Sequence, residues 1–471
     1  MGERILAVLA GRWGWLAAAA LAVFFLLLHP IGFTGGGADD SRYLEAARCW
    51  AATGTMCLPD NHWASRWPAL APIAAGIVVF GEDRTSIGLG TLAGWIASVV
   101  LVGILGRLWF DRATGLLAAI LFASLPLVSG WATQPSVDLI ELAFQLGALA
   151  LATAAYRRQS VALAIAAGVA AALAVQSRET SLLFCAVAAL SWLLLDRDRR
   201  GVLLWALVGF GGEMAVEMLA YAAATGDPLA RYRLSLGHVA IPSPELGPHV
   251  DTSRSPLLNP DYIAGWKRDA GIELWWPIDP WLNLLASPVI GLWLIAAAGL
   301  GLIHKGDGRP TAGRIALGAA LVAVLVVYVL AVDPKPRMFL SLAVAAVLVI
   351  GWATVGLVRR GRGTVPMAVV ALLFGWGAMT IVRLPDTKAL EAAARGWIAA
   401  HPGAIESDAR TIGALTLLPE ARALPPVGSG RPLRLVLAIS TCADLANRRA
   451  TVIAERRSDA GTLCLLSPTK G

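Results

Sequence analysis

Apolar runs long enough to cross a lipid bilayer recur along most of this chain. A transmembrane helix needs roughly 17–25 mostly apolar residues, and shorter helices are tolerated inside a bundle. Eleven runs are candidate spans: 14–30, 86–106, 113–128, 138–155, 161–176, 181–195, 202–223, 286–303, 315–332, 338–357 and 365–382. The stretch 69–80 is too short to span, and we expect it to lie at the membrane interface or to re-enter. The sequence therefore predicts an all-α polytopic membrane protein.

Composition agrees with this prediction. The chain is 57% hydrophobic and 15% charged, whereas soluble domains are roughly 45–50% apolar and about 25% charged. These values exclude a disordered chain, a disulfide-held mini-protein and an ordinary cytosolic enzyme. The net charge of +7 fits a nucleic-acid partner, anionic lipid or cationic loops on one side of a membrane, so the positions of the basic residues must decide.

Basic residues cluster in alternate loops between the candidate spans. The clusters are Arg4 and Arg12; Arg107 and Arg112; Arg157 and Arg158; Arg197, Arg199 and Arg200; Lys305, Arg309 and Arg314; and Arg359, Arg360 and Arg362. Because cytoplasmic loops carry the excess of Lys and Arg, the N-terminus is predicted to be cytoplasmic and the C-terminus to lie outside. The positive charge thus sets topology, and we expect no nucleic-acid partner.

Three larger segments fall on the predicted outer side. Segment 31–85 follows the first span, segment 224–285 is rich in Pro and Trp, and segment 383–471 forms the C-terminal tail. The tail has the pattern of a small α/β unit, with a helix over 387–400 and a strand over 433–439. We therefore predict two domains: a membrane domain, 1–382, and a small extracytoplasmic α/β domain, 383–471.

Four of the five cysteines lie in these outer segments. An oxidising exterior permits the disulfides Cys49–Cys57 and Cys442–Cys464, and unpaired thiols are the equally weighted alternative. The fifth, Cys185, lies within a candidate span.

Two adjacent carboxylates, Asp39 and Asp40, stand just beyond the first span, where membrane insertion does not need them. Like charges side by side can raise the pKa of one of them, which suits a general base. The alternative is that one of them caps a helix over 41–52. The two interpretations are compatible, since one aspartate can cap while the other does chemistry.

Further acids lie in or at the ends of spans. Asp138 opens the fourth span, with Glu141 one turn later. The helix dipole favours anions there, yet ionisable groups at membrane depth are functional candidates. Glu213 and Glu217, one turn apart near the middle of a span, form either a polar helix face or a substrate contact.

Three arginines break the positive-inside pattern on the predicted outer side: Arg66, Arg178 and Arg337. One explanation is snorkelling or a pair such as Arg178–Glu179. The other is an anion-binding cluster, because Arg is well suited to phosphate.

Taken together, these residues resemble the C-type glycosyltransferases, membrane enzymes that use a polyprenyl-phosphate sugar as donor. The matching stretches are Asp39-Asp40-x-x-Tyr43-x-x-x-Ala47, Gly54, Arg66-Trp67-Pro68-Ala69-Leu70, Phe80-Gly81, the run 113–138 with Pro126, and Lys335-Pro336-Arg337-Met338-Phe339. Bacterial protein O-mannosyltransferases and lipid A aminoarabinose transferases are the similar families. The layout matches over the whole chain, and the motifs match over about 110 residues.

The resemblance implies roles for particular residues. It marks as catalytic Asp39, Asp40 and Asp138; as ligands of the donor phosphate Arg66, which replaces the usual Lys, Arg178 and Arg337; and as substrate-binding Tyr43, His62 and Glu179. Two departures matter. Met338 stands where Tyr is common, and Trp275-Trp276 is followed by Pro277, so the Trp-Trp-Asp signature of oligosaccharyltransferases is absent. That absence argues against transfer of an oligosaccharide to Asn.

The expected reaction is an inverting transfer of a sugar to an acceptor hydroxyl, with Asp39 as general base. Such base catalysis contributes roughly 10²–10⁴ in rate, and the arginines would stabilise the leaving phosphate. The acceptor is a glycolipid, a glycan or a protein. No metal is required, although His62, His238, His249 and Asp251 leave room for a divalent ion without showing metal-ligand spacing.

Arg far outnumbers Lys, and Ala and Gly are abundant, which favours a GC-rich bacterial genome and hence the bacterial inner membrane. The competing function is a transporter or a flippase for lipid-linked sugars. Such a protein is expected to carry mid-membrane polar residues and paired internal repeats. A purely structural subunit is a third class, and the outer Asp-Asp pair weighs against it.

Overall fold

The structure of the protein is a computed structural model. It describes residues 11, 13–34, 39–55, 57, 62–195, 200–236, 279–304, 318, 336–382, 386–438, 441–443, 450–458 and 460–468. The predicted span 315–332, apart from residue 318, lies outside the described residues. So does most of the Trp-rich segment 224–285, with His238, His249 and Asp251.

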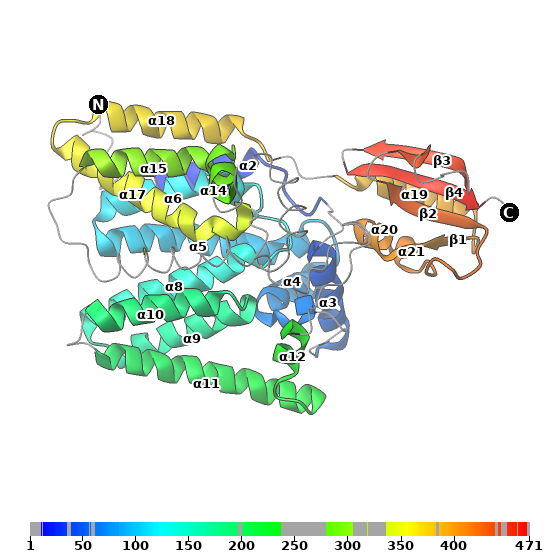
Figure 1. The fold of residues 1–471 in the computed structure, drawn as a ribbon, viewed down its shortest axis with the longest axis horizontal. Helices are drawn as coiled ribbons and strands as arrows, with labels where there is room; N and C mark the ends of the chain where they lie inside the picture. Colours follow the sequence, from blue (N-terminus) through cyan, green and yellow to red (C-terminus); the bar gives the residue numbers. More distant parts are fainter. Residues whose placement is uncertain are drawn as a thin grey trace.

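Helices dominate the described chain, and the long ones lie side by side (Figure 1). The long helices are α2 (Gly14–Leu27), α5 (Leu89–Trp109), α6 (Arg112–Ala123), α8 (Asp138–Arg158), α9 (Val161–Ser177), α10 (Ser181–Leu195), α11 (Arg200–Thr225), α15 (Gly291–His304), α17 (Leu340–Arg359) and α18 (Thr364–Met379). Two short helices, α7 (Pro126–Ser129) and α14 (Asp279–Ala286), accompany them. The prediction of a mostly helical chain is confirmed.

Two predicted spans are interrupted in the structure. The span predicted over 113–128 is split into α6 and α7, because Pro126 disfavours helical backbone at the residue before it. The span predicted over 286–303 begins only at Gly291, after a turn that contains Pro288. Among the described residues, four helices are long and apolar enough to cross a membrane: Ser86–Trp109, Asp138–Arg158, Gly201–Thr225 and Leu340–Arg359. The total of eleven transmembrane spans stays a prediction.

Packing runs from helix to helix through the bundle. Helix α5 packs against α6 and α8, α9 against α8 and α11, and α17 against α6 and α15. Where α9 crosses α11, glycines allow backbone contact. A Cβ on Gly168 would lie 1.8 Å from the carbonyl oxygen of Ala206, and one on Gly209 would lie 2.1 Å from that of Ile165. Small residues of this kind let helices in membranes approach closely.

Three of the basic loops, those that contain Arg112, Arg157 and Arg359, gather at one end of the bundle. Arg359 pairs with Asp111 at 2.6 Å, and Arg112 donates to the carbonyl oxygen of Gly11 at 2.7 Å. Arg157 also donates to the carbonyl oxygen of Leu108. Loops that the charge pattern assigns to the same side therefore do lie together.

Shorter elements lie at the opposite end (Figure 1). They are α3 (Asp39–Thr53), η1 (His62–Ser65), α4 (Trp67–Phe80), η2 (Ser86–Gly88), α12 (Ala230–Leu236) and η5 (Pro336–Phe339). The helix expected over 41–52 is present as α3 and begins at Asp39, and the short apolar stretch 69–80 forms α4. In the first turn of α3, the Asp40 carboxylate accepts a hydrogen bond from the Ser41 amide at 3.0 Å.

The C-terminal residues form a small sheet packed on a helix, as predicted. The elements are α19 (Lys388–Ala400), β1 (Ile405–Ser407), α20 (Ala409–Ala414), α21 (Pro419–Arg422), β2 (Leu433–Ala438), β3 (Ala450–Ser458) and β4 (Gly461–Pro468). The strand order is β1-β2-β4-β3; β1 runs parallel to β2, and the other pairs are antiparallel. Leu390 and Ala394 of α19 share a buried cluster with Leu435 and Leu463 of the sheet.

Both disulfides are formed, Cys49–Cys57 at the end of α3 and Cys442–Cys464 beside β4, and Cys185 is a free thiol.

The C-terminal elements are fastened to the outer helices by polar contacts. Arg48 of α3 donates to the side chain and the carbonyl oxygen of Thr416. Arg84, just before η2, pairs with Glu391 of α19 at 2.6 Å. The Thr387 amide donates to the carbonyl oxygen of Thr34 at 3.0 Å. The sheet thus lies beyond the end of the bundle that carries α3.

Candidate functional site

The first turn of α3 meets an arginine from far along the chain. The Asp39 carboxylate pairs with Arg337 of η5 at 2.9 Å, and the Asp39 side chain is 39% exposed. The Arg337 guanidinium also lies over the ring of Trp131, 5.4 Å from its centre. Among the described residues, the buried Nε of Arg337 has no hydrogen-bond partner. Arg337 therefore holds Asp39 and keeps one donor unused.

One turn along α3, Tyr43 faces Arg66, which immediately precedes α4. Arg66 donates to the Tyr43 hydroxyl, and its guanidinium lies 6.0 Å from the centre of the ring. Burial raises the pKa of Tyr43, so the hydroxyl stays neutral. Arg66 also faces Glu179 at 3.7 Å. Its buried Nε, like that of Arg337, finds no partner in the described part of the chain.

The third arginine, Arg178, occupies the turn between α9 and α10. It pairs with Asp138 at 2.8 Å and with Glu141 at 3.4 Å, both on the first turn of α8. Glu141 in turn accepts from the Ser181 hydroxyl at 2.6 Å and from the Gln145 amide at 3.1 Å. The α8 acids are thus buried partners of an arginine.

The Arg178–Glu179 pair that the sequence suggested as an explanation is not formed as expected. Arg178 pairs with the acids of α8, and Glu179 faces Arg66 and Arg231 instead. Burial raises the pKa of Glu179, but the guanidiniums of Arg66 and Arg231 outweigh this and hold the pKa below its ordinary value. Neighbouring residues on a turn point to different partners, which their sequence spacing does not reveal.

Most of the predicted site residues converge at this end of the bundle. Charges on Arg66, Arg178, Asp39 and Asp138 all act on Tyr43. Asp40 serves the first turn of α3. His62 opens η1, and its side chain is outside the described part of the structure.

Sequence reasoning missed one charged group, Arg231 of α12. It is 1% exposed and pairs with Glu217 of α11 at 2.7 Å and with Glu179 at 3.1 Å. Glu217 lies near the middle of a predicted span, and a carboxylate there needs a buried counter-charge. That need was the sequence signal for a partner such as Arg231. The choice among several downstream arginines required the fold.

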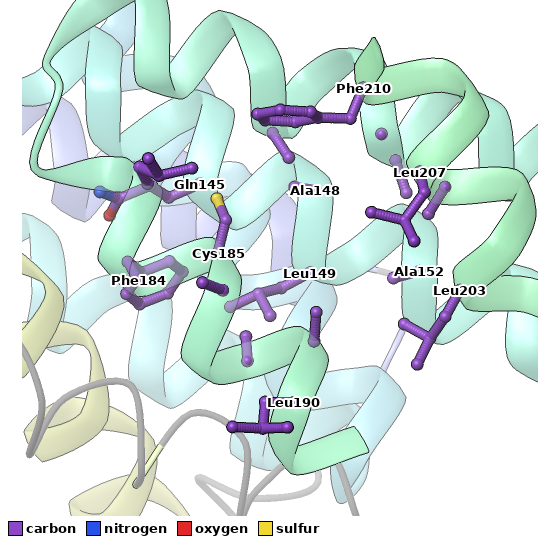
Figure 2. A pocket seen from close by; sticks show the side chains of 18 of the residues that line it. Gln145, Ala148, Leu149, Ala152, Phe184, Cys185, Leu190, Leu203, Leu207 and Phe210 are labelled. Carbon is purple, nitrogen blue, oxygen red and sulfur yellow. The ribbon is translucent and has the colours of Figure 1, made fainter. Parts of the chain in front are cut away.

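An apolar cavity of about 550 Å³ lies between α8, α9, α10 and α11. Figure 2 shows Leu149, Phe184 and Cys185 among its lining residues, with Gln145 at one edge. Gln145 is also the residue that donates to Glu141, the partner of Arg178. The cavity therefore begins where the arginine–acid cluster ends.

No group of three or more His, Cys, Asp or Glu side chains that could hold a metal ion is found among the residues that the structure describes. The acids near Tyr43 are engaged by arginines. This charge arrangement suits an anionic ligand better than a cation.

Comparison with known proteins gives a family match. The sequence model described as dolichyl-phosphate-mannose-protein mannosyltransferase matches residues 39–219. The match begins at Asp39 and includes Arg66, Asp138 and Arg178. A search of curated proteins gives no match.

Solved structures give the fold. The oligosaccharyltransferase of Archaeoglobus fulgidus, in complex with Zn and sulfate, is 14% identical with a TM-score of 0.54, over 87% of this chain and 58% of that one. AglB from the same organism, with an inhibitory peptide and a dolichol-phosphate, is 13% identical with a TM-score of 0.51, over 88% and 61%. ArnT from Cupriavidus metallidurans bound to undecaprenyl phosphate is 15% identical with a TM-score of 0.46, over 98% and 99%.

The resemblance to C-type membrane glycosyltransferases is thereby confirmed, by sequence over residues 39–219 and by fold through the oligosaccharyltransferase. The chain spans less than two thirds of the length of that oligosaccharyltransferase.

Proposed function

We propose that this protein transfers a sugar from a polyprenyl-phosphate donor to an acceptor hydroxyl, with inversion at the anomeric carbon and with Asp39 as general base. The observation that carries the proposal is that two residues one turn apart on α3 each meet an arginine: Asp39 pairs with Arg337, and Tyr43 accepts from Arg66. Among the described residues, the buried Nε of each arginine has no hydrogen-bond partner. Of the acids here, Asp39 is 39% exposed and Asp138 6%. An incoming hydroxyl therefore reaches Asp39 far more readily.

The donor phosphate is assigned to Arg66 and Arg337. Each holds a residue of α3 through a terminal nitrogen, and the buried Nε of each has no hydrogen-bond partner among the described residues. Charge-assisted hydrogen bonds from guanidinium to phosphate are short and strong. Arg178 already faces two carboxylates, so its proposed contribution is the field of its charge rather than direct ligation.

The reaction is a single displacement. The acceptor oxygen attacks the anomeric carbon while Asp39 takes its proton, and the bond from that carbon to the phosphate oxygen breaks. The leaving group is a polyprenyl phosphate, a weak base that needs charge stabilisation more than a proton. Preorganised cations at developing negative charge supply such stabilisation. The arginines thus make an additional divalent ion unnecessary in this scheme.

The lipid part of the donor is assigned to the cavity between α8 and α11. Its lining is almost wholly apolar, and its Gln145 edge borders the cluster around Arg178. An isoprenoid chain is apolar and suits such a space. AglB, whose fold is similar, has been solved with a dolichol-phosphate, a lipid of the same class.

The proposed location is the bacterial inner membrane, which the Arg-, Ala- and Gly-rich composition supports. Loop charge supports an orientation with the N-terminus cytoplasmic and the α3 end outside. The acceptor is then a glycolipid, a glycan or a protein of the cell envelope.

The test uses purified protein, a polyprenyl-phosphate sugar and a mixture of candidate envelope acceptors. Asp39→Asn is expected to lower turnover by roughly 10²–10⁴ with unchanged folding. Glu45→Gln is the matched control, because Glu45 lies on the same helix with an exposed side chain paired to Arg42. Turnover of Asp39→Asn equal to that of Glu45→Gln contradicts the assignment of the base.

A further inference from the structure

We infer that Arg231 is a positioning residue that sets both the place and the available charge of Arg66 for the donor phosphate, an inference that rests on the proposed function. Arg231 lies on the short helix α12, outside the residues 39–219 that match the family. Its side chain is 1% exposed, although arginine is almost never fully buried unless it is paired. The contacts that it makes explain this burial.

The two terminal nitrogens of Arg231 make the same two kinds of contact. Nη1 donates to Glu217 at 2.7 Å and to the carbonyl oxygen of Ser65 at 3.2 Å. Nη2 donates to Glu179 at 3.1 Å and to the carbonyl oxygen of Val175 at 3.1 Å. Each nitrogen therefore joins one carboxylate and one backbone carbonyl, and the guanidinium fastens α12 to α11, α9, η1 and the α9–α10 turn.

The contact with Ser65 bears directly on Arg66. Ser65 is the residue before Arg66, and its carbonyl oxygen also accepts the Tyr221 hydroxyl at 3.1 Å. Two buried donors from α11 and α12 thus fix the backbone from which the Arg66 side chain extends. Misplacement of a positioned group by about 1 Å can cost roughly 10²-fold. Because Arg66 is assigned to bind the donor phosphate, that cost is expected in donor affinity.

The contact with Glu179 bears on the charge of Arg66. Glu179 lies nearer to Arg231, at 3.1 Å, than to Arg66, at 3.7 Å. The Ser235 hydroxyl of α12 holds the same carboxylate oxygen at 2.9 Å. Because α12 holds one oxygen of Glu179, the other oxygen faces Arg66 at 3.7 Å, which is longer than a hydrogen bond. Glu179 therefore does not occupy a guanidinium donor of Arg66. Without Arg231, Glu179 would be free to close on Arg66.

Lysine cannot reproduce this arrangement. A lysine ammonium is a single point of charge with three donors, whereas the planar guanidinium presents donors on two sides. Arg231→Lys keeps the positive charge but cannot serve both carboxylates and both carbonyls. The conservative variant therefore separates geometry from charge.

The experiment measures turnover of a polyprenyl-phosphate sugar, and binding of undecaprenyl phosphate, by the full-length protein. Arg231→Lys is expected to raise both the KM for the donor and the Kd for undecaprenyl phosphate roughly 10–100-fold, with a change in kcat below about threefold. Arg233→Lys is the matched control, because Arg233 lies on the same helix with a 73% exposed side chain. Equal behaviour of the two variants overturns the inference.

A double variant tests whether Arg231 affects donor binding through Arg66. If Arg231 acts through Arg66, Arg231→Lys has little further effect on KM in an Arg66→Lys background. A full additional loss in that background overturns the inference. Should Arg231→Lys not fold, Tyr221→Phe takes its place in both backgrounds, because it removes the other buried donor to the Ser65 carbonyl oxygen and leaves the ion pairs intact.

The two measurements distinguish failure of the proposed function from failure of this inference. If the wild type binds undecaprenyl phosphate but turns over no donor, the proposed glycosyl transfer is wrong. The binding measurements on the Arg231 variants then still test the inference. If the wild type does neither, the inference falls with the function.

Discussion

Five carboxylates and four arginines share the site, and none of these arginines stands alone. The pairs are Asp39–Arg337, Asp138–Arg178, Glu141–Arg178, Glu179–Arg66, Glu179–Arg231 and Glu217–Arg231. Buried ion pairs contribute little net stability, because desolvation offsets their attraction. We propose that their effect here is to hold the guanidiniums in place for the proposed phosphate ligand, because preorganisation lowers the entropy lost on binding.

Phosphate binding should therefore depend on guanidinium geometry at two of these residues. We expect Arg66→Lys and Arg337→Lys each to raise the Kd for undecaprenyl phosphate about 10-fold, equivalent to about 1.4 kcal/mol, because lysine lacks the Nε donor that each arginine keeps unused. Arg42→Lys is the control, since Arg42 is half exposed on α3 and pairs with Glu45. A binding titration in which all three variants match the wild type would remove the phosphate assignment.

The residues of the site differ in how far the sequence revealed them. Asp39, Arg66 and Arg337 were predictable, because charged residues at the outer ends of spans break the patterns that insertion and topology impose. Arg231 was not, because one arginine in a Trp- and Pro-rich segment has the ordinary pattern of an exposed loop. Its burial against Glu217 follows only from the packing of α12 on η1 and α11.

The sequence also could not show which side chains pair with one another. Arg178 and Glu179 are adjacent, yet the backbone at Arg178 is extended after α9 ends, and the two side chains meet different helices. Both cysteine pairs could be proposed from their shared segments, but only their proximity in the fold shows the bonds.

At the scale of elements, the α9–α11 crossing shapes the cavity, and its glycines should not tolerate a methyl group. Gly209→Ala places a Cβ against the carbonyl oxygen of Ile165, and overpacking of this kind costs roughly 1–3 kcal/mol. Gly211→Ala, on the same helix, meets nothing within 4 Å and should gain up to about 1 kcal/mol of helix propensity. Thermal unfolding in detergent measures both, and a Tm for Gly209→Ala at or above that of Gly211→Ala would contradict the close crossing.

The C-terminal sheet carries a pH-sensitive residue in β1. Burial raises the pKa of Glu406, but hydrogen bonds from Gly428, Ser429 and Arg434 outweigh it and hold the pKa below the ordinary value of 4.5. A carboxyl with a lowered folded pKa contributes stability above its unfolded pKa and loses it as pH falls through the folded value. We expect protection of 405–438 from hydrogen exchange to decline below about pH 4.5, after correction for the intrinsic exchange rate. In Glu406→Gln that decline should be weaker, and an identical pH profile would refute the assignment.

The runs of apolar residues made most elements predictable, since helices occupy the described candidate spans. The ends of these elements were less predictable from the sequence. The break between α6 and α7 and the late start of α15 depend on Pro126 and on the turn through Pro288, where local backbone preference overrides hydropathy.

At the scale of the whole molecule, the C-terminal unit and the site share one helix. Asp39 and Tyr43 stand at the start of α3, and Arg48 near its end joins Glu82 and Thr416. Arg84 and Thr34 add contacts to Glu391 and Thr387. The sheet therefore braces the helix that presents the proposed base. The short outer elements and the α9–α10 turn supply the arginines, and the bundle supplies the cavity.

The most direct measurement follows the anomeric configuration of the product by NMR during a single turnover by the wild-type protein. A single displacement assisted by one base predicts release of one polyprenyl phosphate per sugar transferred and a product of inverted configuration. Retention of configuration would contradict the single displacement. Movement of intact donor across a bilayer without release of polyprenyl phosphate would contradict glycosyl transfer itself.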